Sequence, residues 1–272
     1  MSAFKGFQQT GGFAATVKPT QLFQGFTDTS FGQLGNIGGV PSTNLVAWFN
    51  PSLNITLGTG VSSWLDTTST YNLTQAIGSK QPLYNLTIGN FNGRPYLGWT
   101  ATQYLNAGSI LNIGTNQYLD IVFITQINSY AVQANALTSD GTTHGSSTAG
   151  RYGFYVATAG LFYFDWSDNG NAYQVTNNIG ISGLPTMYMG SVDRAAGKSY
   201  MSQNSNYRQG VVTTSTSSGN LTPNNFTVGA NSVGGLPLVG DILDILIYIG
   251  NTPMSQTDYQ SLRVYMGQIY GF

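Results

Sequence analysis

The side chains best suited to chemistry lie in the segment 165–171, Asp-Trp-Ser-Asp-Asn-Gly-Asn. Asp165, Ser167 and Asn169 put oxygen ligands at alternate positions before a glycine, as in the first half of a calcium-binding loop. The twelfth position of such a loop, where a bidentate glutamate is usual, holds Thr176. The alternative is an Asp/Asn-rich hairpin turn, whose side chains hydrogen-bond to their own backbone.

The same segment suits sugar recognition, because an aromatic ring stands among carboxylate and amide groups. The ring face of Trp166 would stack on sugar C–H groups while the polar side chains bind hydroxyls. Those polar partners would be Asp165, Asp168 and Asn169. Alternatively, Trp166 points inward, because Phe162, Phe164 and Trp166 share one face of a predicted strand.

The other reactive side chains of this 272-residue chain argue against catalysis. All ten acidic residues are aspartates, and there is one histidine and no cysteine. This excludes Glu/Glu pairs, cysteine nucleophiles, and cysteine or multi-histidine metal sites. His144 lies in a loop by composition, and the chain has no G-x-S-x-G elbow that would make it part of a hydrolase triad. We therefore expect a non-enzymatic protein; a glycoside hydrolase would need two converging aspartates.

Charge is unusually scarce. Only 7% of residues are charged, against about 25% in typical soluble domains, and the net charge is −1. With so little self-repulsion, we expect a homo-oligomer or a part of a larger assembly. The sequence has no stripe of basic residues, so we do not expect nucleic acid as a partner. The start of the chain lacks the apolar region of a secretory signal, and no apolar run reaches about 18 residues, so we expect neither Sec export nor membrane insertion.

Residues 1–40 differ from the rest in being rich in phenylalanine and glycine without periodicity. They hold a repeat, F-x-G-F-x-x-T, at 4–10 and 23–29. Two rings around a permissive glycine suit an extended arm that inserts aromatic anchors into another surface. The predicted anchors are Phe4, Phe7, Phe23 and Phe26. The alternative is a coincidental repeat in a flexible tail.

From Val40 onward, strand-like runs alternate with Gly, Asn and Ser clusters, which predicts an all-β sandwich of two antiparallel sheets. The predicted strands are 45–49, 119–127, 153–157, 161–164, 187–192, 226–229 and 242–249. The last run is apolar on both faces apart from Asp244, so it belongs in the middle of a sheet that is covered on both sides. One short C-terminal helix is expected, starting at Ser255 with Asp258 three residues later. Its buried stripe would be Tyr259, Leu262, Met266 and Ile269.

Several short motifs in this order resemble the concanavalin A-like lectin/glucanase superfamily in its laminin-G-like form. They are residues 47–52 (AWFNPS), 61–66 (VSSWLD), 81–82 (QP), 92–95 (NGRP), 240–248 and 262–271. The resemblance implies a jelly roll of the kind common in phage and large-virus structural proteins. It also implies that the hairpin 192–199 lies in the ligand-facing sheet, which adds Arg194 to the candidate glycan contacts. Asp244 stands where the glucanase branch has an acidic residue, and we interpret it as structural and hydrogen-bonded.

Together these observations predict an extended docking arm over 1–40 and a jelly-roll domain over 41–272. We expect a virion structural protein, such as a capsid decoration, spike or fibre component. Its arm would bind other virion proteins, and its jelly roll would face outward and bind host-surface glycans. The alternative is a free extracellular lectin exported without a Sec signal. No cofactor is expected apart from calcium in the 165–171 segment.

Overall fold

The computed structural model describes residues 36–37, 39–86, 91–100, 102–129, 134–139, 151–157, 160–168, 171–175, 183–213, 221, 225–231 and 234–272. Gly35–Phe272 forms one compact unit. Most of the predicted arm, including Phe4, Phe7, Phe23 and Phe26, lies outside the described residues.

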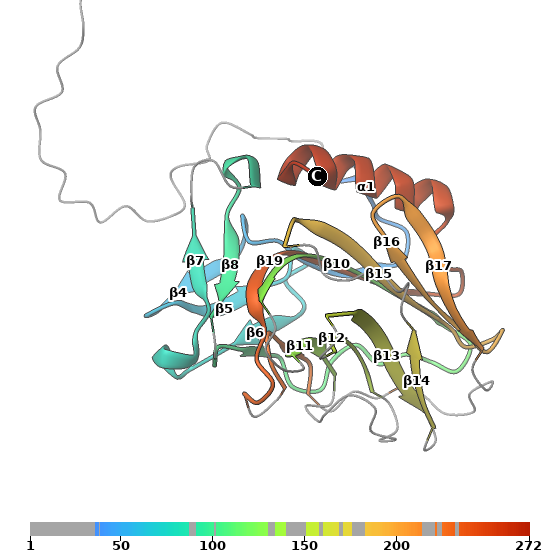
Figure 1. Ribbon diagram of the computed structural model, residues 1–272, viewed down its shortest axis with the longest axis horizontal. Helices are drawn as coiled ribbons and strands as arrows, with labels where there is room; N and C mark the ends of the chain where they lie inside the picture. Colours follow the sequence, from blue (N-terminus) through green and yellow to red (C-terminus); the bar gives the residue numbers. More distant parts are fainter. Residues whose placement is uncertain are drawn as a thin grey trace, which may run out of the picture. The chain divides into compact units, whose positions relative to one another are not determined.

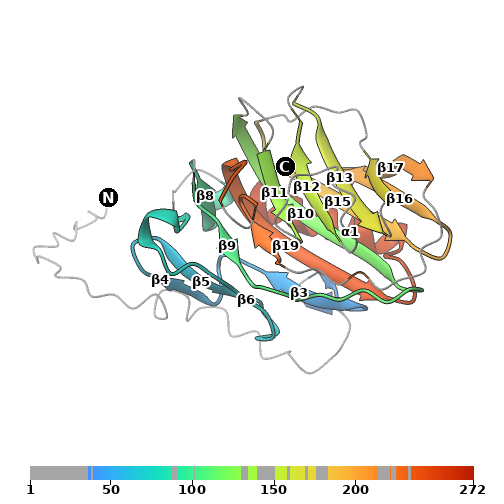
Figure 2. The same ribbon diagram turned by 90° about the horizontal axis from the view of Figure 1, so that it is seen from below.

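The described residues form two antiparallel sheets packed face to face, with one helix on the outer face of the first sheet (Figures 1 and 2). This confirms the predicted all-β sandwich with a C-terminal helix. The eight-stranded sheet consists of β3 (Leu45–Phe49), β7 (Leu83–Asn85), β8 (Tyr96–Trp99), β10 (Tyr118–Ser129), β15 (Thr186–Asp193), β16 (Lys198–Gln203), β17 (Asn206–Thr213) and β19 (Val239–Gly250). The nine-stranded sheet consists of β4 (Ile55–Leu57), β5 (Val61–Leu65), β6 (Asn72–Thr74), β9 (Leu105–Asn106), β11 (Ala134–Thr138), β12 (Tyr152–Val156), β13 (Phe162–Asp168), β14 (Asn171–Val175) and β18 (Thr227–Val228). A separate pair joins β1 (Asn36–Ile37) to β2 (Val40–Pro41).

The strand order explains which elements are central. The first sheet runs β17-β16-β15-β10-β19-β8-β7, with β3 also paired to β19. The second runs β14-β13-β12-β11-β18-β9-β6-β5-β4. At one end of the sandwich, edge strand β14 packs against β16 and β17. The last strand in the chain, β19, therefore lies inside its sheet, as its apolar sequence predicts.

The main core lies between the two sheets and is rich in aromatic rings. Phe123, Phe154 and Phe162 stack on one another, with ring centroids 5.4–6.4 Å apart. Across the sandwich from Phe164 stands Gly190, where even a methyl group would lie only 2.2 Å from the ring. The close approach of β13 to β15 thus depends on a glycine.

A second core lies between the eight-stranded sheet and helix α1 (Gln256–Tyr270). Ser255 caps the helix by accepting a hydrogen bond from the Asp258 backbone N–H at 3.0 Å, and it donates to the Asp258 carboxylate at 2.8 Å. This is the predicted start of the helix, although the Asp258 carboxylate accepts from the Ser255 hydroxyl and not from its backbone N–H as in a full capping box. The helix ends at Gly271, which adopts φ +81°, and its N–H donates back to Gly267. The buried stripe is Tyr259, Leu262, Met266 and Tyr270; Ile269, which we predicted in this stripe, is only half-buried.

Asp244 lies in this second core and is structural, as predicted. Trp48 Nε1 donates to its Oδ1 at 2.7 Å, and the Tyr270 hydroxyl donates to its Oδ2. Its carboxyl group thereby joins β3, β19 and the end of α1. Burial raises its pKa to about 7, although these two hydrogen bonds act in the opposite direction.

Other details depart from the sequence-based picture. Strands β4–β9, β11, β14 and β17 carry too short or too polar a pattern to be singled out from sequence. The Asn92-Gly93 turn between β7 and β8 is part of a 3₁₀ turn, η3 (Phe91–Gly93), which is one of two such turns in the described residues, with η2 (Gly78–Lys80). No helix in the described part of the chain is long and apolar enough to cross a membrane.

Candidate functional site

The predicted tryptophan contact is buried. Trp166 lies on β13 and its side chain is 0% exposed, in the core between the sheets with Phe162 and Phe164. The alternation of a strand therefore directs its indole inward. A ring in this position cannot stack on a sugar, so the predicted glycan contact at Trp166 is wrong and the inward alternative holds.

The polar residues of the same segment lie on an extended strand. Asp165 is 3% exposed and forms an ion pair with the Arg151 guanidinium, and Ser167 is fully buried. Because Asp165 is already neutralised and both residues are covered, the predicted calcium ligation by Asp165 and Ser167 and the predicted glycan contact at Asp165 are wrong. Asp168 ends β13 opposite Asn171, which fits the alternative hairpin. The side chain of Asp168 and the whole of Asn169 lie outside the described residues.

Arg194 has a structural role. Its side chain is 1% exposed, and Nη1 donates to the carbonyl oxygens of Ile113 at 3.2 Å and Gly114 at 2.9 Å. The guanidinium fork thus fixes the loop that leads into β10. This burial contradicts the predicted glycan contact at Arg194. His144 lies outside the described residues, which contain no group of three His, Cys, Asp or Glu side chains that could hold a metal ion.

The structure instead draws attention to the outer face of the eight-stranded sheet, where α1 covers only part of the surface (Figure 1). Under the helix this face is apolar. Its residues there include Val122, Ile124, Met187, Met189 and Leu246. Beyond the N-terminal end of the helix, the outward positions on the same strands become polar. They are Tyr118 and Asp120 on β10, Ser191 and Asp193 on β15, and Lys198 and Tyr200 on β16.

Two tyrosines on either side of β15 define this polar area. Tyr118 lies opposite Asp193, and Tyr200 lies opposite Ser191, so one strand separates the two tyrosines. Strands lie about 4.8 Å apart, so the two rings are anchored on strands about 10 Å from each other. Both side chains are partly exposed. The two tyrosines are also offset by two residues along the sheet, because Tyr118 is in register with Asp193 and Tyr200 with Ser191.

Arg208 on β17 lies against Tyr200 and against its own neighbour, Tyr207. Its guanidinium is 4.6 Å from the ring centroid of Tyr200 and 5.2 Å from that of Tyr207. Its backbone adopts φ +51°, which is unusual for a residue other than glycine, and its N–H donates to Ser202 Oγ at 2.6 Å. The bulge between β16 and β17 therefore directs this side chain over the sheet.

Asp120 provides the negative charge beneath Arg208. Its Oδ1 lies 3.6 Å from Arg208 Nη2, and its Oδ2 accepts a hydrogen bond from the Met254 backbone N–H at 2.8 Å. Burial raises the pKa of Asp120, while Met254 and Arg208 act to lower it. We call Tyr118, Tyr200 and Arg208 the tyrosine–arginine site, with Asp120, Ser191 and Asp193 as its buried polar support.

A cavity of about 300 Å³ lies next to this site, at the start of α1. Tyr248, which is paired with Asp120 across the sheet, forms part of its wall. The remaining lining is mostly neutral and polar. It comprises Pro41, Thr43, Asn44, Thr252, Pro253, Met254, Ser255 and Asp258. Hydroxyl and amide groups of this kind match a ligand that is rich in hydroxyl groups.

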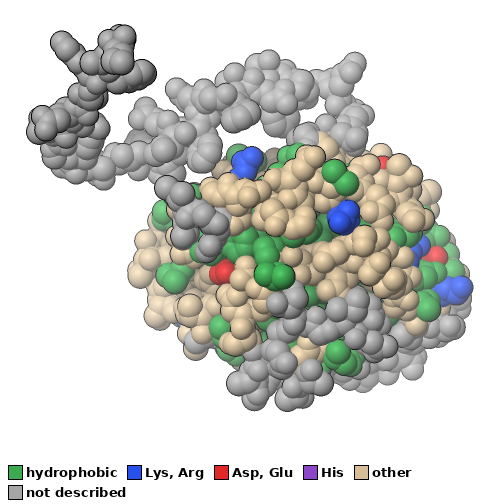
Figure 3. Space-filling view, turned by 45° about the horizontal axis from the view of Figure 1, so that its top comes forward, with side chains coloured by type: hydrophobic (Ala, Val, Ile, Leu, Met, Phe, Trp, Pro, Cys, Tyr) green, Lys and Arg blue, Asp and Glu red, His purple; other side chains and the backbone are tan. Residues whose placement is uncertain are grey.

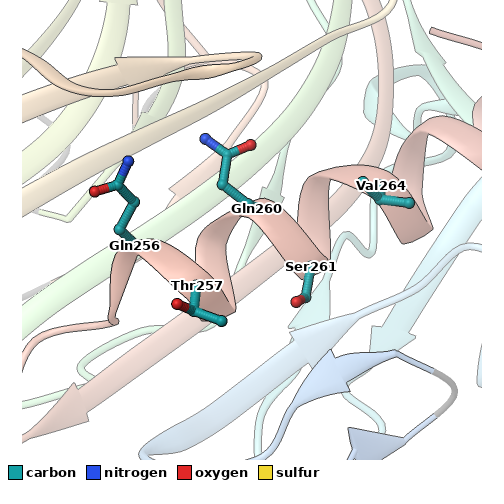
Figure 4. A pocket seen from close by; sticks show the side chains of 5 residues that line it. All are labelled: Gln256, Thr257, Gln260, Ser261 and Val264. Carbon is teal, nitrogen blue, oxygen red and sulfur yellow. The ribbon is translucent and has the colours of Figure 1, made fainter.

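A second hollow, of about 660 Å³, lies along the outer face of α1 (Figure 4). Gln256 and Gln260 project to one side of the helix, and Thr257 and Ser261 to the other. With Val264, these are the described residues of its lining, and they include no ring and no charge. Figure 3 shows the same character more widely, with isolated charges on a mostly neutral face. The tyrosine–arginine site is therefore the better candidate for a specific ligand.

Sequence reasoning missed this site because its members come from β10, β15, β16 and β17, which are far apart in the chain. Only the strand register brings Tyr118, Ser191 and Tyr200 together, and a one-residue slip would send any of them into the core. The dipeptide Tyr207-Arg208 after a polar turn was the one local signal of a surface ring beside a cation.

No protein-family model matches the sequence, and no curated protein is similar to it in sequence. Solved structures are similar in fold. Domain 4 of AbnA, a GH43 extracellular arabinanase from Geobacillus stearothermophilus solved with arabinotriose, matches with a TM-score of 0.55 and 14% identity. The match covers 81% of this chain and 98% of that domain. The chain shares its two-sheet jelly-roll fold with this domain.

Other similar structures contain this jelly roll as part of a longer chain. The Trypanosoma rangeli sialidase in complex with the inhibitor DANA matches with a TM-score of 0.55 and 10% identity, over 85% of this chain and 36% of the sialidase. A structure of botulinum neurotoxin type C matches with a TM-score of 0.54 and 11% identity. Cell entry of that toxin depends on interaction with two ganglioside molecules. That match covers 82% of this chain and 51% of the toxin chain. These chains have in common a fold that occurs in carbohydrate-recognising proteins.

Proposed function

We propose that this jelly roll is a non-catalytic carbohydrate-binding domain that binds glycans at the tyrosine–arginine site. The observation that carries the proposal is the pair of partly exposed tyrosines, Tyr118 and Tyr200, on either side of β15 and beside Arg208. Tyrosine faces bind the C–H groups of a sugar, while the Arg208 guanidinium, whose side chain is 17% exposed, offers polar contacts to its hydroxyl or acidic groups. The arabinotriose and ganglioside ligands of the similar structures support this class of ligand.

A non-catalytic role is part of the proposal. Retaining glycosidases need two carboxyl groups about 5 Å apart, one acting as acid and one as nucleophile. Here Asp165 is paired with Arg151, Asp244 is buried against Trp48 and Tyr270, and Asp120 is buried beneath Arg208. These carboxyl groups already have structural partners, and the chain has no glutamate.

We further propose that the domain belongs to a virion surface component that is anchored by its N-terminal arm. The support is the resemblance to phage and large-virus structural proteins, the repeated Phe-x-Gly-Phe motif and the low net charge. Replacing Phe4 and Phe23 by alanine would remove one ring from each repeat and block incorporation into particles, with the melting temperature unchanged. Normal incorporation of this double variant would favour the alternative, a free extracellular lectin.

The glycan-binding proposal is tested by an array of neutral and acidic oligosaccharides probed with the full chain. We expect Tyr118→Ala and Tyr200→Ala each to weaken binding about tenfold, because each removes one stacking contact. The matched control is Tyr163→Ala, which removes a partly exposed tyrosine from β13 on the other sheet. Equal binding by all three variants would place the glycan elsewhere, and an array without any bound glycan would overturn the proposal.

A further inference from the structure

We propose a second carbohydrate site at the opposite end of the same sheet face, formed by amide and carboxylate groups and selective for neutral saccharides. Its residues are Asn85, Gln126, Asn128 and Asp241, with Leu83 at its border; we call it the amide site. It goes beyond the function proposed above, because it shares no residue with the tyrosine–arginine site and requires a different ligand chemistry.

The strand register brings these residues into one row. Gln126 on β10 lies opposite Asp241 on β19, Asp241 lies opposite Gly98 on β8, and Gly98 lies opposite Leu83 on β7. Asn85 is two residues beyond Leu83 and therefore projects from the same face. Asn128 lies at a register irregularity of β10, and its hydrogen bond to Asp241 places it on this face. Gln126 is six positions after Asp120 on β10, which is about 20 Å along the strand. The two sites are therefore separate.

Hydrogen bonds already order the polar groups. Gln126 Nε2 donates to Asn128 Oδ1 at 3.1 Å, and Asn128 Nδ2 donates to Asp241 Oδ2 at 3.3 Å. Each amide can donate two hydrogen bonds and accept two, and a carboxylate accepts about four. The two hydrogen bonds from Gln126 to Asn128 and from Asn128 to Asp241 use a small part of that capacity. The remainder matches vicinal hydroxyl groups, each of which donates one hydrogen bond and accepts others.

Gly98 lets two of these side chains meet. A methyl group added there would lie 2.8 Å from Asn85 Nδ2 and 3.3 Å from Asp241 Oδ1. The amide of Asn85 and the carboxylate of Asp241 thus converge above the glycine, a donor beside an acceptor. Such a pair can receive one hydroxyl group and donate to its neighbour.

Exposure and charge indicate which ligand the site would take. Leu83 is 46% exposed and Asn128 is exposed, so a ligand can reach both the apolar border and the amides. Burial raises the pKa of Asp241, which means that its carboxylate is incompletely solvated and gains from added hydrogen-bond donors. The residues that form the site include no cation. An acidic sugar would therefore be repelled by Asp241, whereas a neutral sugar offers only hydroxyls and C–H groups.

The test measures binding of neutral methyl glycosides of glucose, galactose and arabinose to the full chain by ligand-observed NMR. We expect Asp241→Asn, which removes the carboxylate, to weaken binding about 10- to 100-fold. Asn128→Ala, which removes one amide, should weaken binding less. Gln256→Ala, on the exposed face of α1, is the control and should leave the dissociation constant unchanged. Circular dichroism and the melting temperature of each variant establish that it is folded.

The double variant Tyr118→Ala/Tyr200→Ala separates the two proposals. Binding of a neutral glycoside that survives this double variant and is lost in Asp241→Asn establishes the amide site. Binding that is lost in the double variant and unchanged in Asp241→Asn overturns the amide site and leaves the tyrosine–arginine site standing. A folded wild-type chain that binds no neutral glycoside also overturns it, and glycan-array binding then decides the first proposal separately.

Discussion

Two arginine–aspartate pairs on the outer faces of the two sheets differ in how they meet solvent. Arg151 and Asp165 form a direct ion pair, with side chains only 1% and 4% exposed. Arg208 and Asp120 approach only to 3.6 Å, and the arginine side chain is 17% exposed and flanked by tyrosines. The first pair has its charges matched and covered, so it serves stability. The second leaves a cation and two rings at the surface, which is what a ligand needs.

The largest effect is expected from breaking the covered pair. Asp165→Asn leaves the Arg151 guanidinium buried without a counter-charge, which costs about 3–5 kcal/mol in the free energy of unfolding. Urea denaturation of the variant and the wild type measures this loss. A loss below about 1 kcal/mol would show that solvent reaches Arg151 and that the two pairs do not differ as described.

Asp244 extends the comparison with Asp165 and Asp120, because it is a buried aspartate without a cation in direct contact among the described residues. The Asp244 carboxyl has a pKa of about 7 in the folded chain, raised by burial above its ordinary value near 4. The folded state therefore holds this proton more tightly than the unfolded state does. The resulting stability is fully present below pH 4 and is lost as the pH rises through about 7, by up to about 4 kcal/mol.

Chemical denaturation at a series of pH values measures this slope. Asp244→Asn should flatten most of it, and the remainder reflects Asp120 and Asp241, whose pKa values are also raised by burial. Gln256→Ala, which removes an exposed and non-titrating side chain from α1, is the control and keeps the slope. An unchanged slope in Asp244→Asn would contradict the assignment.

The smallest change in stability is expected at the exposed pair. Arg208→Lys keeps the charge but loses the planar group between Tyr200 and Tyr207, which costs about 1 kcal/mol in stability. Thermal unfolding measures this change. Glycan binding should fall more than stability does, because lysine cannot reproduce the fork of the guanidinium. A variant that loses several kcal/mol would instead put Arg208 in the same class as Arg151.

Local sequence patterns predicted the elements that have strong periodicity. The apolar run 242–249 gave a central strand, and the Ser255 and Asp258 pair gave the start of the helix, because both signals lie within a few residues. Asp244 was also interpreted correctly, since a carboxyl among Ile and Leu needs donors. The partners themselves, Trp48 and Tyr270, are 196 and 26 residues away, and no local pattern identifies them.

The candidate site was the harder part to predict. Composition directed attention to Trp166 because tryptophan beside Asp and Asn is typical of sugar binding. The alternation of β13, with Phe162 and Phe164 on the same face, decided the outcome instead. Tyr118 and Tyr200 look like ordinary strand residues until the pairing of β10, β15 and β16 is known, and pairing between distant strands is set by the whole core.

The position of β19 has a consequence for how the chain reaches its folded state. This strand pairs with β3, β8 and β10, yet it is synthesised after every other strand of both sheets. On a ribosome, the eight-stranded sheet therefore stays split, with apolar strand edges uncovered, until residues 239–250 emerge. Contacts between such distant segments also make folding slow. Nascent chains that stall before β19 should be the ones that aggregate or recruit chaperones.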